Sequence, residues 1–264
     1  MKLISRLLVL FSLVLITQVT YAQNKDDERN YIKERKMKYR KGTRNHFKID
    51  LGINNYLENN DFPDANNALY SVKPFGSWYV ALNSINKSNI AGPLFVEWGG
   101  GFSWYNFKFE NTDTRITKTN NGVVFDKDIR DINPIKSKLS ASFINVSFVP
   151  LLDFGYSKRI HNHWRFPDGD IDIDFRRKYG LRIGFGGYAG YRLGSRSKQV
   201  YSLNGDRKKD RETSNFFINN IRYGLRAQLG VGRVDMFANY DLNELFSDNK
   251  GPKLNAFSFG FTLL

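Results

Sequence analysis

From residue 46 onward, large apolar residues alternate with small or polar residues in eight separate runs. Successive side chains of a β-strand point to opposite faces, so a run with a period of two predicts a strand with one apolar face. The runs cover residues 47–54, 77–84, 94–105, 144–154, 179–194, 221–229, 234–242 and 255–264. Over the same part of the chain, no run of comparable length has the period of a helix. The pattern therefore predicts an all-β fold.

The connections between these runs alternate in length. Long polar connections cover residues 57–74, 111–138 and 195–215, and shorter ones cover 86–93 and Gly232-Arg233. A two-residue link that begins with glycine is typical of a tight hairpin, and it would pair residues whose numbers sum to 465, such as Gly224 and Asp241. The connection 157–178 stands where the alternation of lengths predicts a short turn, but it is long. The sequence FPDGD within it indicates the turn of a hairpin extension. An even number of strands with this loop asymmetry is typical of an outer-membrane barrel, in which the last run pairs with the first.

Alternation alone leaves open whether the apolar face points inward, as in a lipocalin-like soluble barrel, or outward into lipid. The interior of an eight-stranded barrel is only just wide enough for side chains, and the non-apolar face is rich in glycine and other small residues. The opposite face carries the bulky aromatic residues that bilayer interfaces favour. We therefore expect an eight-stranded antiparallel transmembrane β-barrel of the outer-membrane type. Its lipid-facing residues would include Trp98, Leu225, Phe257, Phe259 and Phe261.

The inward face of this predicted barrel carries a small set of charged residues. In the register described above, Asp241 lies diagonal to both Arg222 and Arg226, within reach of long side chains. Arginine and aspartate that neutralise each other are physically reasonable inside a closed barrel. The expected network consists of Glu97, Arg182, Arg222, Arg226, Asp235 and Asp241.

The first 22 residues have the features of a cleaved signal peptide. Lys2 and Arg6 accompany the apolar stretch 7–16, and the small residues Thr20 and Ala22 precede a cut before Gln23. Residues 23–45 would then form a basic periplasmic segment, and residues 46–264 would form the barrel. The chain has no cysteine, which excludes disulfides, a thiolate metal site and a lipid anchor at the cleavage point.

Part of the formal net charge of +14 lies in two basic stretches, residues 24–45 and 195–215. Residues 24–45 are typical of a solvated flexible segment, the alternative being an arm for anionic lipid or a partner protein. Nucleic acid is not an expected partner of an exported chain. At the cell surface, the basic connection 195–215 would meet the phosphates of lipopolysaccharide, although an ordinary solvated loop is the alternative. The residues that would contact lipopolysaccharide are Arg196, Lys198, Arg207, Lys208 and Lys209.

Three motifs could carry chemistry, and each has a simpler interpretation. GFGGYA (184–189) fits the dinucleotide fingerprint, but that motif works between a strand and a helix, and here the alternation continues through it. Asp168, Asp170, Asp172 and Asp174 would share one face of a strand, too widely spaced to wrap a cation, and favour an acidic hairpin extension instead. The three histidines, His46, His161 and His163, have no serine or further metal ligands that can be assigned to them. We therefore expect no cofactor, no metal and no catalytic residue.

Four stretches carry a resemblance to a known family: YAQ at the end of the signal, FINVSFVPLLDFGY, LRIGFGGYAGYRLGS and DLNELFSDNKGPKLNAFSFGFTLL. In these stretches the chain resembles outer-membrane β-barrel proteins of the Bacteroidota, the broad family that includes the PorT-type barrels. The resemblance implies a location in the cell outer membrane and, for PorT-type members, service to a protein-secretion machine.

The function expected from these observations is structural. The chain would be an accessory subunit or surface-interaction protein, within a secretion or barrel-assembly complex, in contact with outer-membrane lipid, lipopolysaccharide and other outer-membrane or periplasmic proteins. The alternatives are a narrow channel and a lipid-modifying outer-membrane enzyme. We do not expect an enzyme.

Overall fold

The computed structural model describes residues 43–66, 68–155, 180–232 and 234–263, together with the backbone of residues 161–164 and 173–176. All of them belong to the second of the two units into which the chain divides, Lys41–Leu264. The described residues form strands and connections and contain no helix. The all-β prediction is therefore confirmed.

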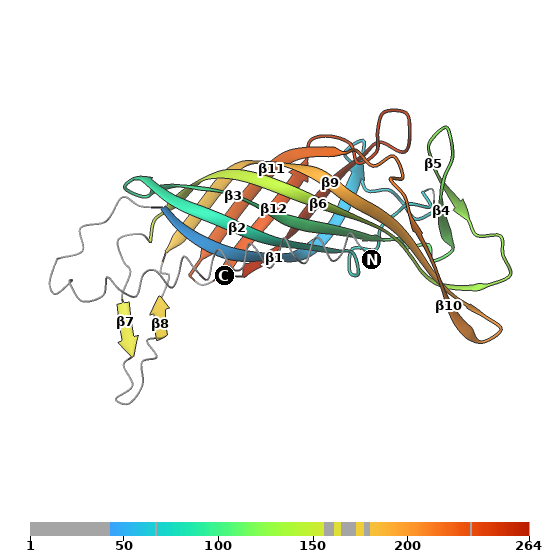
Figure 1. Cartoon of the computed structure of the whole chain (residues 1–264), viewed down its shortest axis with the longest axis horizontal. Coiled ribbons are helices and arrows are strands. Elements are labelled where there is room, and N and C mark those ends of the chain that lie inside the picture. The colour runs from blue at the N-terminus through green and yellow to red at the C-terminus, as the bar shows by residue number, and fades with distance from the viewer. Residues whose placement is uncertain are drawn as a thin grey trace, which may run out of the picture. The chain divides into compact units, whose positions relative to one another are not determined.

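Eight strands form a closed ring in which every neighbouring pair is antiparallel (Figure 1). In order around the ring they are β1 (Thr43–Glu58), β2 (Trp78–Ala91), β3 (Leu94–Lys108), β6 (Asn133–Asp153), β9 (Leu181–Leu203), β11 (Ile221–Val231), β12 (Val234–Asp241) and β13 (Leu254–Leu263). β13 pairs with β1, from Ile49 opposite Leu263 to Glu58 opposite Leu254. The expected pairing of the last run with the first is thus confirmed, and the ring leaves no edge between these two strands.

The eight strands are strongly tilted. A row of paired residues that starts on β1 at Asn45 passes once around the ring and returns to β1 at Asn55, ten residues further along. The row runs through Asn45, Asn86, Trp98, Phe148, Gly187, Leu225, Tyr240, Phe257 and Asn55. Ten residues correspond to about 33 Å along a strand and eight strand spacings to about 38 Å, so the strands tilt by about 41° from the ring axis.

The close approach of β1 and β13 depends on glycine. Gly52 and Gly260 lie opposite each other in the ladder. A Cβ atom on Gly260 would lie 2.2 Å from the backbone oxygen of Leu51, and one on Gly52 would lie 2.3 Å from that of Phe259. No side chain fits at these distances, so glycine at both positions lets the ring close.

The connections differ at the two ends of the ring. At the short-turn end, Gly92 and Pro93 join β2 to β3, and Gly232 and Arg233 join β11 to β12. β11 and β12 pair with residue numbers that sum to 465, including Gly224 opposite Asp241, as the sequence predicts. The long-connection end carries residues 59–77, 109–132, 204–220 and 242–253.

The stretches 111–138 and 195–215, predicted to be long polar connections, contain strands that the sequence pattern did not predict. Residues 111–138 contain the hairpin of β4 (Thr114–Lys118) and β5 (Val123–Lys127), and β6 already begins at Asn133. β9 continues to Leu203 and turns at Asn204 and Gly205, which have φ of 52° and 86°, into β10 (Asp206–Thr213). Two positive φ angles are typical of a type I′ hairpin turn. β10 is polar on both faces, and β4 and β5 are only five residues long each, so the alternation of hydrophobicity does not reveal these strands.

A further antiparallel hairpin lies in the connection between β6 and β9. It consists of β7 (His161–Trp164) and β8 (Ile173–Arg176). A hairpin extension was predicted in this connection, whereas the FPDGD turn itself lies outside the described residues.

The apolar core lies inside the ring near the long-connection end. Tyr105 and Phe107 of β3 are fully buried there, and Phe216 and Phe246 from two of the long connections pack into the same cluster. Tyr56 and Phe107 contact each other with ring centroids 5.1 Å apart. This aromatic cluster therefore joins the interior of the ring to the connections that cover it.

Candidate functional site

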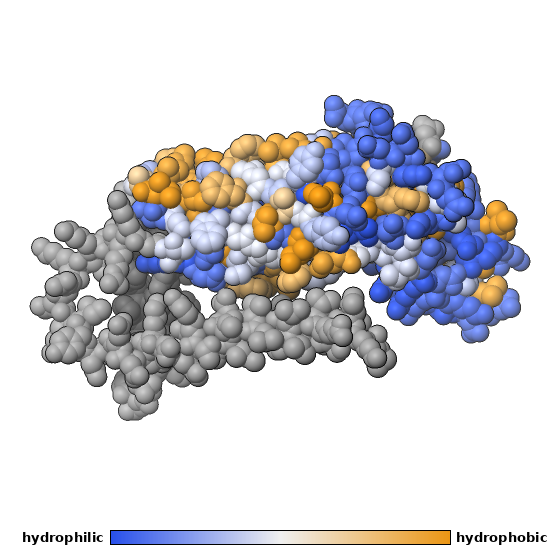
Figure 2. All heavy atoms as spheres, turned by 45° about the horizontal axis from the view of Figure 1, so that its top comes forward, coloured by the Kyte–Doolittle hydropathy of each residue, from blue (hydrophilic) through white to orange (hydrophobic). Residues whose placement is uncertain are grey.

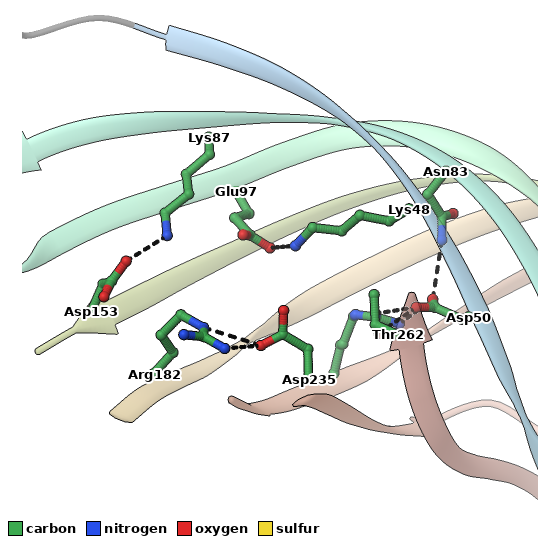
Figure 3. Close-up of polar contacts among 10 residues, drawn as sticks. Lys48, Asp50, Asn83, Lys87, Glu97, Asp153, Arg182, Asp235 and Thr262 are labelled. Atoms are coloured by element: carbon green, nitrogen blue, oxygen red, sulfur yellow. Dashed lines mark hydrogen bonds and ion pairs between the residues drawn. The ribbon is translucent and has the colours of Figure 1, made fainter. Parts of the chain in front are cut away.

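Charged side chains fill the interior of the ring between the aromatic cluster and the short-turn end. Three ion pairs lie there, and each joins two strands across the strand between them (Figure 3). They are Lys48–Glu97 at 2.7 Å between β1 and β3, Lys87–Asp153 at 2.9 Å between β2 and β6, and Arg182–Asp235 at 2.6 Å between β9 and β12. The alternation that places apolar side chains outside places these side chains inside.

Asp50 of β1 is the centre of a fourth contact, which crosses to the opposite side of the ring. Asp50 is 1% exposed. Its two carboxylate oxygens lie 3.0 Å from Nη1 and 3.2 Å from Nη2 of Arg226 on β11. Asn83 of β2 donates to the same carboxylate at 3.0 Å, and Thr262 of β13 donates at 2.6 Å. Four strands therefore meet at one buried carboxylate. Because an ionised carboxylate offers about four acceptor positions, its hydrogen-bonding capacity is filled.

Gln228 links this contact to the Lys48–Glu97 pair. In the amide orientation that satisfies both neighbours, its nitrogen donates to Glu97 at 3.1 Å and its oxygen accepts from Nε of Arg226 at 2.9 Å. The interior thus contains a continuous chain of polar contacts from Asp50 through Arg226, Gln228 and Glu97 to Lys48.

Arg222 lies in a different environment, enclosed by aromatic rings. Its guanidinium carbon is 4.7 Å from the ring centroids of Tyr105 and Phe143 and 5.1 Å from that of Tyr188. Cation–π attraction of this kind is stronger where water is excluded. Asn145 accepts from its Nε at 3.1 Å and Ser103 accepts from Nη2 at 3.2 Å.

The expected pairing of Asp241 with Arg222 and Arg226 needs correction. Arg226 pairs with Asp50, and Asp241 accepts hydrogen bonds from the hydroxyls of Tyr105 and Tyr188. The 465 register correctly places these residues as diagonal neighbours, but it describes only one hairpin. Asp50 lies on a strand that faces this hairpin across the interior, and the register of one hairpin cannot show which strand that will be.

The side chains of the network line a small cavity. A cavity of about 30 Å³ is lined by parts of the network, including Lys48, Asp50, Glu97 and Arg222. A space of this size holds one or two water molecules. No group of three or more histidine, aspartate or glutamate side chains that could hold a metal ion occurs among the described residues.

All six charged residues of the expected network lie on the inward face of the ring. Five of them are buried, namely Glu97, Arg182, Arg222, Arg226 and Asp241, and the side chain of Asp235 is 17% exposed. Sequence reasoning left Lys48, Asp50, Lys87 and Asp153 out of the network. For Lys48, Asp50 and Asp153 the signal was present, because each is a charged residue on the inward side of an alternating run, whereas Lys87 lies in the stretch 86–93 that was assigned to a connection.

The outward face of the ring is apolar and exposed. Trp98, Leu225, Phe259 and Phe261 are 38–55% exposed, and Phe257 is partly covered by Phe62 at a centroid distance of 6.0 Å. Figure 2 shows apolar side chains gathered over the strands and hydrophilic ones over the long-connection end. Exposed apolar surface on this scale is rare in monomeric soluble proteins and is typical of an interaction surface.

The residues predicted to contact lipopolysaccharide lie on two paired strands and not in a loop. Arg196 and Lys198 belong to β9, and Arg207, Lys208 and Lys209 belong to β10. Because adjacent residues of a strand point to opposite faces, Lys208 lies on the other face from Arg207 and Lys209. These five residues therefore do not form a single surface.

Several other predictions fall partly or wholly outside the described residues. Asp168, Asp170 and Asp172 lie outside them, and for Asp174, His161 and His163 only the backbone is described. His46 lies in β1. Of the basic segment 23–45, residues 43–45 are the first residues of β1 and the rest lies outside the described part.

The described chain is thus a closed ring of eight antiparallel strands with a filled, charged interior and an apolar exterior. Comparisons with family models, with curated proteins and with solved structures gave no match for the chain. Among the described residues, no helix is both long and apolar enough to cross a membrane.

Proposed function

We propose that this protein is an eight-stranded β-barrel of the bacterial outer membrane that works as a structural or accessory subunit. A secretion or barrel-assembly complex is the setting that the resemblance to PorT-type barrels suggests. The observation that carries the proposal is the combination of an apolar exterior with an interior closed by its own side chains.

The height of the apolar exterior supports insertion into a bilayer. Every outward residue of β11 is apolar or aromatic: Ile221, Tyr223, Leu225, Ala227, Leu229 and Val231. Ten residue steps span about 33 Å, which at a tilt of about 41° gives about 25 Å along the ring axis. The apolar band of outer-membrane barrels has a height of about 25 Å.

The positions of the outward aromatic residues give independent support. With the tilt derived above, each residue step along a strand rises about 2.5 Å along the axis, and each step to the next strand in a paired row rises about 3 Å. On this scale, six outward aromatic residues from six different strands lie within about 5 Å of one height, near the long-connection end. They are Trp78, Trp104, Tyr191, Tyr223, Tyr240 and Phe257. Bilayer interfaces favour an aromatic girdle of this kind.

The filled interior favours a structural role over a channel. The ion pairs and the Asp50 contact cross the interior, and the aromatic cluster fills it beyond them. The cavity that this network lines, of about 30 Å³, has room for one or two water molecules, which favours a closed interior over an open pore. The function is then carried by surfaces outside the bilayer.

The long-connection end is built as an ordered surface. Arg130, in the connection between β5 and β6, bridges Asp128 at 2.5 Å and Asp210 of β10 at 2.8 Å, and its guanidinium lies 4.7 Å from the ring of Tyr201. The hydrogen bonds from Arg130 lower the pKa of Asp128 to about 2, against the opposing effect of its burial. A connection held in this way supports a protein partner better than a free loop would, because less order has to be gained on binding.

The membrane part of the proposal is tested by cysteine labelling, since the chain has no cysteine of its own. Phe261→Cys should resist a water-soluble maleimide in membranes and react after the protein is unfolded, whereas the matched control Lys127→Cys on β5 should react in both states. Equal, rapid labelling of both variants in membranes would refute insertion.

The subunit part is tested by gentle detergent extraction with prior crosslinking. A crosslinkable residue at Ile129, which is 98% exposed, should capture a specific neighbouring protein. The same residue placed at Leu229, inside the apolar band, is the control. A protein that extracts alone and gives no crosslink would refute the subunit role, and a steady conductance in a planar bilayer would show that the barrel is a channel instead.

A further inference from the structure

Four basic residues stand side by side across four neighbouring strands. Lys108 of β3 is opposite Lys138 of β6, Lys138 is opposite Lys198 of β9, and Lys198 is opposite Arg211 of β10. Residues directly opposite in a ladder have side chains on the same face with Cβ atoms about 5 Å apart, and like charges in these positions repel each other. We name Lys108, Lys138, Lys198 and Arg211 the cationic row.

The acidic residues of the same strands do not neutralise this row. On β10, Arg207 and Lys209 share the face of Arg211, whereas Asp206, Asp210 and Glu212 alternate with them and lie on the other face. Asp210 is engaged there by Arg130 and by the hydroxyl of Tyr201. Within the part of the chain that the structure describes, no ion pair joins the cationic row to a carboxylate.

The electrostatics of the row reflect this arrangement. The pKa of Lys198 is lowered by loss of hydration and, next, by the charges of Arg211 and Lys209. The pKa of Lys138 is lowered in the same way by loss of hydration and then by Lys136 and Lys198. The chain therefore keeps several cations close together although their repulsion destabilises the folded state.

The row begins at Lys108, beyond the apolar band, and rises away from it strand by strand. Lys108 follows Trp104 of the aromatic girdle by four residues on the same face of β3. Four residues rise about 10 Å along the axis, and each further strand of the row rises about 3 Å. The row therefore extends from about 10 to about 19 Å beyond the girdle. Lipid headgroups extend several Å beyond the hydrocarbon core, and long basic side chains reach back toward them, so Lys108 lies nearest to the bilayer and only a headgroup that projects further meets the whole row.

We propose that the cationic row binds the phosphate groups of a lipid headgroup in the leaflet around the long-connection end of the barrel. The inference rests on the proposed membrane insertion and names a ligand for that surface. Lysine and arginine form strong charge-assisted hydrogen bonds to phosphate oxygens. Three strand spacings give the row a length of about 15 Å, which suits a glycolipid headgroup with two or more phosphates better than a single phosphate. Lipopolysaccharide has this chemistry.

The test compares two triple variants of the full-length protein that change the net charge equally. The row variant is Lys108→Gln/Lys138→Gln/Lys198→Gln. The control is Arg115→Gln/Lys127→Gln/Lys208→Gln, which removes three exposed basic residues at the same end of the ring but off the row. Each protein is placed in phosphatidylcholine nanodiscs that contain bisphosphorylated lipopolysaccharide or its dephosphorylated form, and bound glycolipid is measured by native mass spectrometry.

The wild type and the control should retain the phosphorylated glycolipid, and the row variant should bind it about a hundredfold more weakly, as expected for the loss of three basic residues at an anionic membrane surface. Thermal unfolding provides a second readout. In phosphate-free neutral detergent the row variant should unfold at a higher temperature than the wild type, because the repulsion is gone, and the order should reverse when phosphorylated lipopolysaccharide is added.

Retention by the row variant equal to that of the wild type would overturn the inference. So would equal binding of the dephosphorylated glycolipid, or displacement of the glycolipid by an equal concentration of inorganic phosphate, which would make the row a site for free phosphate. Failure of the proposed membrane insertion is distinguished from these outcomes by the labelling of Phe261→Cys, which does not involve the row.

Discussion

The contact at Asp50 gives the sharpest test of how the interior is held together. Asp50→Asn keeps the shape of the side chain and removes the charge that faces Arg226. Arg226 is itself buried, so its guanidinium would be left inside the ring without a counter-charge. Thr262 and Asn83 donate to different oxygens of the carboxylate, and an asparagine offers only one oxygen, so one of the two donors would lose its acceptor.

The expected magnitude follows from burial. Removing one partner of a buried ion pair costs about 3–5 kcal/mol because the remaining charge is not compensated. Asp50→Asn should therefore lower the free energy of unfolding by this amount. In Asp50→Asn/Arg226→Met the stranded charge is gone as well, so the double variant should be more stable than Asp50→Asn alone. The Arg182–Asp235 pair is the matched control, and Asp235→Asn should cost less because that carboxylate is 17% exposed.

Urea unfolding of the protein in phospholipid vesicles, followed by tryptophan fluorescence, measures these differences. A double-variant cycle gives the coupling between Asp50 and Arg226 directly. If the cost of the double variant equals the sum of the two single costs, the two side chains are not coupled, and the account of the interior as an ion-paired plug is wrong.

Three further predictions concern other parts of the ring. Phe261→Arg, near the middle of the apolar band, should lower the stability in vesicles by about 2–4 kcal/mol, whereas Leu242→Arg at the aromatic edge should cost about 0–1 kcal/mol, and equal costs would contradict the tilt derived from the register. Gly260→Ala should cost about 1–3 kcal/mol in urea unfolding, because its methyl group would meet the backbone of β1, and a neutral result would contradict the close approach of the two strands. Asp128 has a folded-state pKa of about 2, below the value of about 3.9 for the unfolded chain, so its stabilising effect is complete above about pH 4 and disappears as the pH falls toward 2. The difference in the free energy of unfolding between the wild type and Asp128→Asn should therefore decrease toward zero as the pH falls from about 4 to about 2. A constant difference would show that the hydrogen bonds from Arg130 do not depend on the charge of Asp128.

The eight strands of the ring could be predicted from the sequence because one face of each is apolar. A period of two fixes which residues share a face, and a tight turn such as Gly232-Arg233 fixes the register of its hairpin. The same reasoning correctly predicted that β13 pairs with β1. These features depend only on neighbours along the chain or on the need to leave no open edge.

The strands beyond the apolar band could not be found in this way. β10 is polar on both faces, and residues 195–203 of β9 carry apolar residues on both faces, Val200 on one and Tyr201 on the other, so hydrophobicity has no period of two there. A different signal was present, since basic residues at 207, 209 and 211 alternate with acidic ones at 206, 210 and 212. Charge alternation defines faces in the same way as hydrophobic alternation.

The partners within the interior depend on the tilt of the whole ring. Asp50 meets Arg226 because the ten-residue displacement sets the height of every strand relative to the strands across from it. This ten-residue displacement is a property of the whole ring. It cannot be derived from one hairpin, because it depends on the registers of all eight strand pairs.

The pairing of β1 with β13 also has a consequence for how the chain reaches its folded state. These two strands are about 200 residues apart in the sequence and join last in any order of assembly that adds neighbouring hairpins one by one. Until they meet, the sheet has two open edges whose backbone groups are free to pair with another molecule. The intermediate is thus prone to pair with other chains at both edges, and this tendency ends only when β13 meets β1.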